Sequence, residues 1–194
     1  SVIINSSNPI ENQDFSSTDV AIDFSTPNSA YHNIKCVLAQ GIPVVSGTTA
    51  WLENLDNVKQ LAKEKATGFL YASNFSIGIN LFYELNKKLS QLMQNQSEYK
   101  ASIKEIHHAE KLDMPSGTAL SLQSQIPNIL DIESERTENV TGTHIVNYDS
   151  EIDSISITHK AHNRIGFAKG ALIAAEWIID KKGCFSMSDI LKIN

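Results

Sequence analysis

Residues 105–119 gather the side chains of this chain that are best suited to chemistry. The segment reads EIHHAEKLDMPSGTA and places two histidines, a lysine and an aspartate ahead of a Ser-Gly-Thr turn. Imidazole titrates near neutral pH, so His107 and His108 are candidates for supplying a proton to a developing carbanion. Lys111 can donate a proton or hold a carboxylate, and Asp113 can orient either group. Because adjacent residues of a strand face opposite ways, two histidines that serve one ligand predict a loop here.

The turn Ser116-Gly117-Thr118 has the composition of an anion site. Ser116 can cap the helix expected to follow, and the free N–H groups at a helix start favour a negatively charged group. Gly117 has no side chain, so a carboxylate can approach its backbone closely. A capping turn without a ligand is the alternative, and for this turn taken alone it is favoured because hydroxyl caps are common.

A metal site built from His107, His108, Glu110 and Asp113 is a competing interpretation. Adjacent histidines lack the i, i+4 spacing of helical metal ligands, and Lys111 would bring a positive charge close to the ion. We therefore expect no metal. A metal-dependent hydrolase is the weaker alternative, and it predicts stoichiometric zinc or manganese in the purified protein.

Two polar turns elsewhere follow apolar, strand-like runs. In open α/β sheets, ligands bind at the carboxyl ends of the strands, so these turns are candidates for lining a nucleotide crevice. An ordinary strand-to-helix turn and a domain junction are the respective alternatives. The candidate residues are Gly47, Thr48 and Thr49 in the first turn and Ala72, Ser73, Asn74 and Phe75 in the second.

Arg164 lies in a second basic cluster, THKAHNR. A guanidinium can pair bidentately with a carboxylate, which makes Arg164 a candidate for substrate binding. The alternative is a surface cluster at a domain junction.

Two kinds of strand pattern predict two domains. Strand-like runs at 20–24, 43–46 and 69–72 alternate with helical spacing at 27–41 and 56–65. This alternation indicates βαβ units and a doubly wound parallel sheet. The runs at 101–106, 144–148 and 154–159 follow one another without helices, after a long helix near 79–93. They predict an α+β domain with a mixed or antiparallel sheet.

Apolar helical patterns at 167–179 and 187–193 follow the second group of strands. Residues 2–4 predict a short strand, but no G-x-G-x-x-G turn precedes them, so we expect the sheet to lack its first strand.

Composition excludes several classes of protein. The net charge is −6, and no basic run could neutralise successive phosphates, so nucleic acid is not an expected partner. The longest mostly apolar run is too short and too charged to span a bilayer. Two distant cysteines in apolar contexts predict buried free thiols rather than a disulfide, and a reducing cytoplasm as the default compartment.

The run EIHHAEKLDMPSGTA closely resembles the signature of the dihydrodipicolinate reductase family, E-x-H-H-x-x-K-x-D-x-P-S-G-T-A. The resemblance is extended by DFSTP, SGTT, SNFSIGIN, GTH and THKAHNR, which together span essentially the whole chain. It implies a Rossmann domain for NADPH or NADH at 1–76 and 165–194, a substrate and tetramerisation domain at 77–164 inserted into it, and a homotetramer. The implied reaction is reduction of dihydrodipicolinate to tetrahydrodipicolinate in lysine and diaminopimelate biosynthesis.

The resemblance also assigns roles to residues. His107 is implied as the proton donor or acceptor and Lys111 as a proton donor. The implied partners of the substrate dicarboxylate are His108, Gly117 and Thr118, with Ser116 and Arg164 added by the residue chemistry above. The implied contacts with the cofactor are Gly47, Thr48, Thr49, Ala72, Ser73, Asn74 and Phe75.

Three departures from the family pattern affect the nucleotide half. The Gly-rich phosphate turn is absent from this sequence, Asn5 falls where an acidic residue often meets the adenosine ribose, and Thr26 falls where some members carry an arginine. These departures fix neither the preference for NADH or NADPH nor the activity of this chain. The alternative function is a non-catalytic remnant that binds a dicarboxylate without a complete nucleotide site.

Overall fold

The computed structural model describes residues 2–127, 129, 131–138 and 140–193. The chain divides into two compact units, one formed by Ser1–Ile77 with Phe167–Asn194 and the other by Gly78–Gly166. The boundaries implied by the family resemblance fall after residues 76 and 164. Each unit has its own sheet and its own core.

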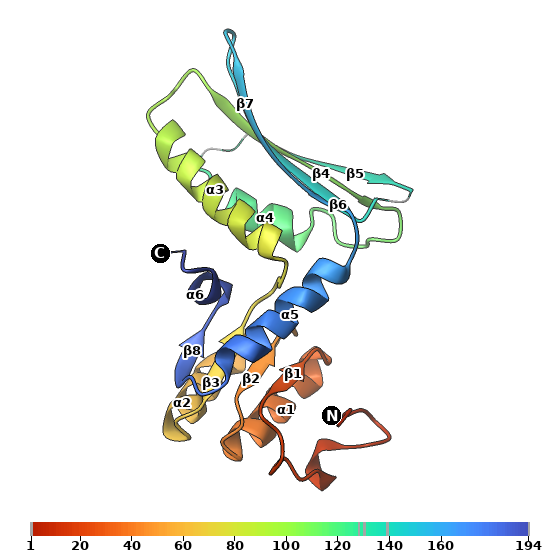
Figure 1. The fold of residues 1–194 in the computed structure, drawn as a ribbon. Coiled ribbons are helices and arrows are strands. Elements are labelled where there is room, and N and C mark those ends of the chain that lie inside the picture. Colours follow the sequence, from red (N-terminus) through yellow and green to blue (C-terminus); the bar gives the residue numbers. More distant parts are fainter. Residues whose placement is uncertain (1, 128, 130, 139, 194) are drawn as a thin grey trace. The chain divides into compact units, whose positions relative to one another are not determined.

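The first unit contains a parallel four-stranded sheet in the order β1-β2-β3-β8 (Figure 1). Its strands are β1 (Ala21–Asp23), β2 (Val44–Ser46), β3 (Gly68–Tyr71) and β8 (Gly183–Phe185). Its helices are α1 (Pro27–Ala39), α2 (Leu55–Glu64), α5 (Ile165–Ile178) and α6 (Met187–Leu191), with short 3-10 turns η1 (Ile10–Asn12) and η2 (Leu52–Asn54). Helix α5 begins in the second unit and continues into the first.

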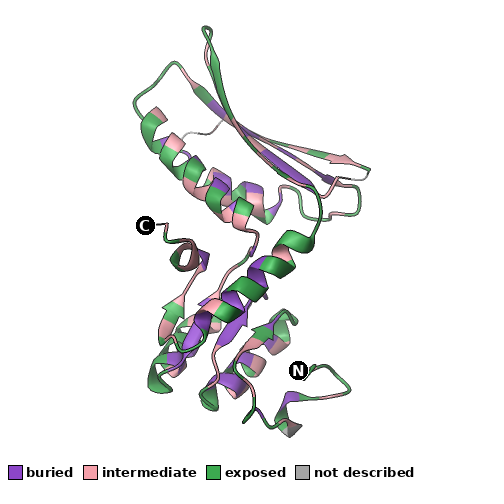
Figure 2. Ribbon diagram, in the orientation of Figure 1, coloured by how far each residue is buried: buried purple, intermediate pink, exposed green. Residues whose placement is uncertain are grey.

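Alternation along the strands supplies two cores, one on each face of this sheet. Val44 and Phe69 pack with α1 and α2, whereas Val45 and Leu70 pack with the small residues of α5. Figure 2 shows the central strands buried between these helices. Because adjacent strand residues face opposite ways, two-sided burial requires the continuous apolar runs seen in the sequence.

Helix α1 begins as its sequence predicts. Thr26 is the N-cap and forms a capping box with Ser29, while Pro27 occupies the first helical position, where its missing N–H costs no hydrogen bond. Gly41, with φ of 79°, follows the helix in the left-handed region that favours glycine.

The second unit is a mixed four-stranded sheet with helices against one face (Figure 1). The order is β5-β4-β6-β7, with β4 parallel to β5 and antiparallel to β6. Its elements are β4 (Lys100–His108), β5 (Ile132–Thr137), β6 (Gly142–Asp149), β7 (Ser154–Ala161), α3 (Ile77–Met93) and α4 (Gly117–Gln123). Phe82 on α3 and Leu122 on α4 pack on Ile103 and Val146 of the sheet. The α/β fold class with an inserted mixed sheet is confirmed.

The structure differs from three predictions made from the sequence. Residues 2–4 are not a strand, and Ile3 is 75% exposed. Strands β5 and β8 were not predicted, because β5 reads IESERT with little apolar content and β8 has only three residues. Both cysteines are free, but Cys36 is half-buried and Cys184 is exposed, so neither is the buried thiol expected.

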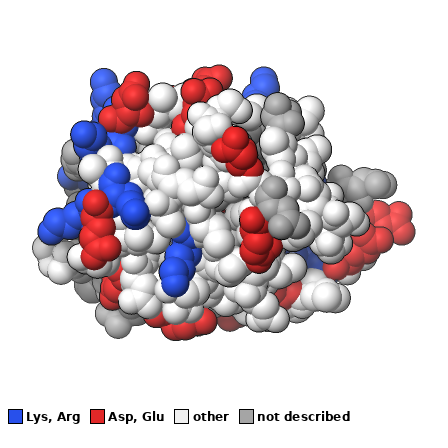
Figure 3. Space-filling model, turned by 90° about the horizontal axis from the view of Figure 1, so that it is seen from below, with Lys and Arg blue, Asp and Glu red and all other residues white. Residues whose placement is uncertain are grey.

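The molecular surface carries both signs of charge. Figure 3 shows basic and acidic side chains around a broad uncharged area on the face in view. Among the described residues, no helix is long and apolar enough to cross a membrane.

Candidate functional site

Both histidines of the signature lie in strand β4 rather than in the predicted loop. Burial alternates along β4 and ends with buried His107 and half-buried His108. In strand geometry the two side chains leave on opposite faces. His107 shares the helix-covered face with Ala101, Ile103 and Glu105, so the expectation that the backbone leaves strand geometry at the two histidines is wrong.

Glu105 is the centre of the polar cluster around His107. Its side chain is fully buried and accepts hydrogen bonds from the Ser116 N–H at 3.0 and 3.2 Å and from the Ser134 hydroxyl at 2.8 Å. The Arg136 guanidinium lies 3.3 Å from Oε1, and His107 Nδ1 lies 3.5 Å from Oε2. A buried carboxylate needs such partners because its ionised form is costly to desolvate.

Sheet register explains why these side chains meet. Glu105 pairs with Ser134 of β5 on one side and with His144 of β6 on the other, and His144 pairs with His159 of β7. One polar row therefore crosses all four strands. His107 pairs with Arg136 two residues along β4, on the same face.

His144 completes the cluster. Its ring meets the His107 ring edge-on at 4.9 Å between centroids, and its Nε2 lies 3.3 Å from the Ser116 hydroxyl and 3.8 Å from Glu105 Oε2. No local sequence pattern identifies a partner for this histidine. The strand pairing that supplies its partners is not visible without the fold.

Burial sets the protonation of the cluster. It lowers the pKa of His144 to about 4, helped by the neighbouring His107. Burial also lowers the pKa of His107, although the Glu105 carboxylate opposes that shift. For Glu105 itself, burial raises the pKa, but the hydrogen bonds from Ser116 and Ser134 outweigh burial and hold it below its usual value. Neutral imidazoles therefore face an ionised carboxylate at neutral pH.

The cluster also resembles a metal site in its spacing. Ligand atoms of Glu105, His107 and His144 lie within 4.8 Å of one another. However, the Arg136 guanidinium and the Ser116 N–H already satisfy the carboxylate, and a cation would sit next to a guanidinium. This triad is not the set of metal ligands that was weighed from the sequence. Its side chains suit a hydrogen-bonded network better than a metal ion.

Lys111 lies on the loop that leaves β4. Its Nζ is 2.6 Å from Asp113 Oδ1, and this ion pair holds the pKa of Asp113 below its usual value. The other oxygen of Asp113 accepts a long hydrogen bond from the Gly117 N–H at 3.4 Å. Arg136 of β5 donates to the carbonyls of Lys111 and Asp113 at 3.3 and 2.7 Å, so a residue that the sequence did not single out holds this loop.

The predicted anion turn forms the start of α4. Ser116 is the N-cap, and its hydroxyl accepts from the Ala119 N–H at 3.2 Å. Gly117 is exposed, and a Cβ at that position would meet nothing within 4 Å. Half-buried Thr118 follows. The turn thus leaves open space beside the Gly117 backbone.

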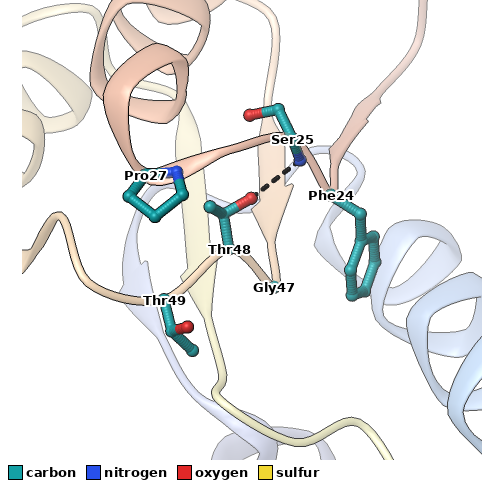
Figure 4. Close-up of a pocket in the computed structure, with 6 residues that line it drawn as sticks. All are labelled: Phe24, Ser25, Pro27, Gly47, Thr48 and Thr49. Carbon is teal, nitrogen blue, oxygen red and sulfur yellow. Dashed lines mark hydrogen bonds between the residues drawn. The ribbon is translucent and has the colours of Figure 1, made fainter.

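The first predicted turn of the parallel sheet lines a pocket of about 200 Å³. Figure 4 shows it at the ends of β1 and β2, with Phe24, Ser25 and Pro27 facing Gly47, Thr48 and Thr49. A Cβ on Gly47 would lie 2.1 Å from the Phe24 ring, so the missing side chain lets that ring lie close to the turn.

Asp23 holds two of the residues that line this pocket, Ser25 and Thr48, by hydrogen bonds. Its carboxylate accepts from the hydroxyls of Ser25, Ser46 and Thr48 at 2.6, 3.0 and 2.8 Å. The Thr48 hydroxyl in turn accepts from the Ser25 N–H at 2.9 Å, the bond drawn in Figure 4. Asp23 belongs to the DFSTP motif, but no role was predicted for it.

The second predicted turn follows β3. Ala72 donates its N–H to the Ser46 carbonyl at 3.2 Å, and buried Phe75 packs against Phe24 with ring centroids 5.5 Å apart. The two turns of the parallel sheet therefore lie side by side. Ser73 is exposed and Asn74 half-buried, whereas Arg164 is exposed in the second unit.

Comparison with known proteins covers both units. Residues 2–75 match the family model described as dihydrodipicolinate reductase, N-terminus, and residues 78–191 match the model of its C-terminus. The 4-hydroxy-tetrahydrodipicolinate reductase of Christiangramia forsetii is 47% identical, over 94% of this chain and 84% of that protein. The enzyme of the same name from Buchnera aphidicola is 38% identical, over 99% of this chain and 78% of that protein.

A solved structure agrees in fold. The dipicolinate-bound dihydrodipicolinate reductase from Paenisporosarcina sp. TG-14 superposes with a TM-score of 0.72 at 24% identity, covering 89% of this chain and 73% of that chain. Two family models that together span nearly the whole chain, and a relative at 47% identity, are sufficient to establish the family. The chain belongs to the dihydrodipicolinate reductase family.

Proposed function

We propose that this chain is an oxidoreductase that reduces dihydrodipicolinate to tetrahydrodipicolinate in the diaminopimelate route to lysine. Family membership over both units and relatives named 4-hydroxy-tetrahydrodipicolinate reductase support the reaction. The observation that carries the proposal is His107, a neutral imidazole held against a buried carboxylate in the unit that contains the anion turn.

His107 is the proton donor or acceptor in this proposal. Reduction of a conjugated cyclic imine leaves an enamine-like carbon that must be protonated, and imidazole can carry that proton near neutral pH. Lys111 is a second proton donor and adds positive charge near a dianionic substrate.

The substrate carboxylates are assigned to the start of α4. The open space beside Gly117 and the N–H groups of the turn favour a carboxylate there, with Ser116 and Thr118 alongside. His108 and Arg164 complete the proposed contacts. His108 leaves β4 on the face opposite His107, so it would reach a different part of the substrate or serve another surface.

The nicotinamide nucleotide, NADPH or NADH, is assigned to the turns of the parallel sheet and supplies the hydride when bound. The absence of a side chain at Gly47 and the hydroxyls of Thr48 and Thr49 fit a polar ring system at the carboxyl ends of β1 and β2. Residues 72–75, with Ala72, Ser73, Asn74 and Phe75, extend the same edge. We further propose that the enzyme works as a homotetramer, as the family resemblance implies, and in the cytoplasm, the compartment expected from its cysteines.

Turnover tests the proposal directly. Oxidation of NADPH and of NADH is followed by absorbance with freshly generated substrate, for the wild type and two variants. We expect His107→Gln to lower kcat much more than it raises KM, because it removes a proton carrier, and Thr118→Val to act mainly on KM. Dipicolinate binding without turnover would favour the non-catalytic alternative, and the reverse pattern of the two variants would overturn the residue roles.

A further inference from the structure

Arg136 connects two groups that the proposed function uses separately. Its guanidinium lies 3.3 Å from the buried Glu105 carboxylate, and the same side chain donates to the carbonyls of Lys111 and Asp113 at 3.3 and 2.7 Å. A fourth bond, to the carbonyl of its neighbour Glu135 at 2.9 Å, fixes the remaining nitrogen. The planar fork of arginine suits several fixed acceptors at once, which an ammonium does not match.

Glu105 reaches His107 through one specific ring nitrogen. His107 Nδ1 is buried and has no hydrogen-bond partner among the described residues, and the carboxylate oxygen Oε2 of Glu105 lies 3.5 Å from it. An ionised carboxylate facing Nδ1 favours a hydrogen on that nitrogen. Nε2 then carries the lone pair of the neutral ring and donates the proton once the ring is charged.

The other groups around His107 leave this arrangement in place. The titratable and charged groups that influence it are Glu105, Lys111, Asp113, Arg136 and His144. His144 packs edge-on against the ring and is itself neutral, so it does not compete for the negative charge of Glu105. Arg136 pairs with Oε1, which leaves Oε2 as the oxygen that faces both imidazoles.

We propose that Glu105 and Arg136 are positioning residues: Glu105 fixes His107 as the Nδ1–H tautomer, and Arg136 ties that carboxylate to the loop of Lys111. Neither residue needs to contact the substrate. The inference rests on the proposed function only where it calls His107 and Lys111 proton carriers, since the tautomer is a property of the protein alone.

Histidine-ring nitrogen spectroscopy tests the inference without substrate or nucleotide. Long-range proton–nitrogen NMR spectra report the tautomer of each histidine, and the His107 signals are assigned by their loss in His107→Gln. We expect the Nδ1–H form of His107 in the wild type and a shift toward the Nε2–H form in Glu105→Gln. An Nε2–H form in the wild type, or one tautomer in both proteins, would overturn the inference.

Two milder variants keep the test informative if Glu105→Gln does not fold. Ser134→Ala removes one hydrogen bond from Glu105, and Arg136→Lys keeps the charge but not the fork. We expect Arg136→Lys to change the amide signals of Lys111 and Asp113 together with the His107 ring signals. Glu133→Gln, at an exposed position on the same strand, is the matched control and should change neither.

If the NMR signals that change in Arg136→Lys are confined to β5, the result would contradict the proposed link between Glu105 and the loop of Lys111. The expected tautomer in a wild type that shows no turnover would reject the proposed function and leave this inference standing.

Discussion

One buried carboxylate stands at the centre of each candidate site, and the two differ in their partners. Asp23, in the parallel-sheet unit, accepts three hydroxyl groups, from Ser25, Ser46 and Thr48. Glu105, in the mixed-sheet unit, accepts a backbone N–H and a hydroxyl and also faces a guanidinium and two imidazoles.

This difference separates a shaping role from a chemical one. Hydroxyl partners fix the positions of turns without moving protons, which suits a surface that receives a cofactor. Imidazoles beside a carboxylate couple position to protonation, which suits a proton-transfer centre. The comparison predicts that perturbing Glu105 changes stability and protonation together, whereas perturbing Asp23 changes stability without changing protonation.

The largest effect is expected for Glu105→Gln. The substitution leaves the largely buried Arg136 without its ionic partner, so the second unit should lose about 3–4 kcal/mol of unfolding free energy. Amide hydrogen exchange in β4 to β7 measures this loss locally, while Trp51 and Trp177 both report on the first unit. Exposed Glu133→Gln should cost less than about 0.5 kcal/mol, and equal losses in the two variants would contradict the special role of Glu105.

The pH dependence of stability should also differ between the units. Because the pKa of His144 is lowered to about 4, the unfolded chain takes up its proton first as the pH falls below the ordinary histidine value. The second unit should therefore lose about 2–3 kcal/mol of stability between about pH 6.5 and pH 4 through His144, since each pKa unit corresponds to ~1.4 kcal/mol. The lowered pKa values of His107 and His159 act in the same direction.

His144→Gln should flatten this dependence, as measured by hydrogen exchange at a series of pH values. The linked protonation of Glu105 lies at lower pH, because the pKa of its carboxyl is held below the usual value. An unchanged slope in the variant would show that His144 is not neutral in the fold.

Two glycines of α5, Gly170 in the first unit and Gly166 at the end of the second, test close backbone packing. A Cβ at Gly170 would lie 1.8 Å from the Phe75 carbonyl oxygen, whereas a Cβ at Gly166 would meet nothing within 4 Å. Gly170→Ala should cost about 2 kcal/mol, since backbone must move, and Gly166→Ala should be neutral or stabilising by up to ~1 kcal/mol. Amide hydrogen exchange along α5 separates them, and similar values would contradict this packing.

A smaller effect is expected for Asp23→Asn. The amide still accepts hydrogen bonds through one oxygen but leaves one hydroxyl without its acceptor, so we expect about 1–2 kcal/mol of destabilisation in the first unit. Unfolding monitored by Trp51, whose indole N–H donates to the Thr48 carbonyl at 2.7 Å, reports on this region. Asp19→Asn, at an exposed position, is the control. A change in the NMR signals of the His107 ring in Asp23→Asn would contradict the independence of the two sites.

Periodicity in the sequence predicted most of the fold, including both sheet classes and the position of α1. It did not reveal β5, because the residues of β5 are mostly polar. This strand is held by its pairing with β4 rather than by burial of its own side chains. The same limit applies to the site. His107 could be singled out by its chemistry, and Glu105 lay within reach because residues two apart share a strand face. Arg136 and His144 come to the site only through strand register, which no local pattern encodes.

The division of roles between the units is tested most directly by calorimetric titration with dipicolinate, with and without NADPH. We predict that the wild type binds dipicolinate and that Thr118→Val binds it at least tenfold more weakly. Without nucleotide, Asp23→Asn should bind dipicolinate with the same affinity as the wild type. No binding by the wild type under either condition, or an equal loss in the two variants, would contradict a dicarboxylate site in the mixed-sheet unit.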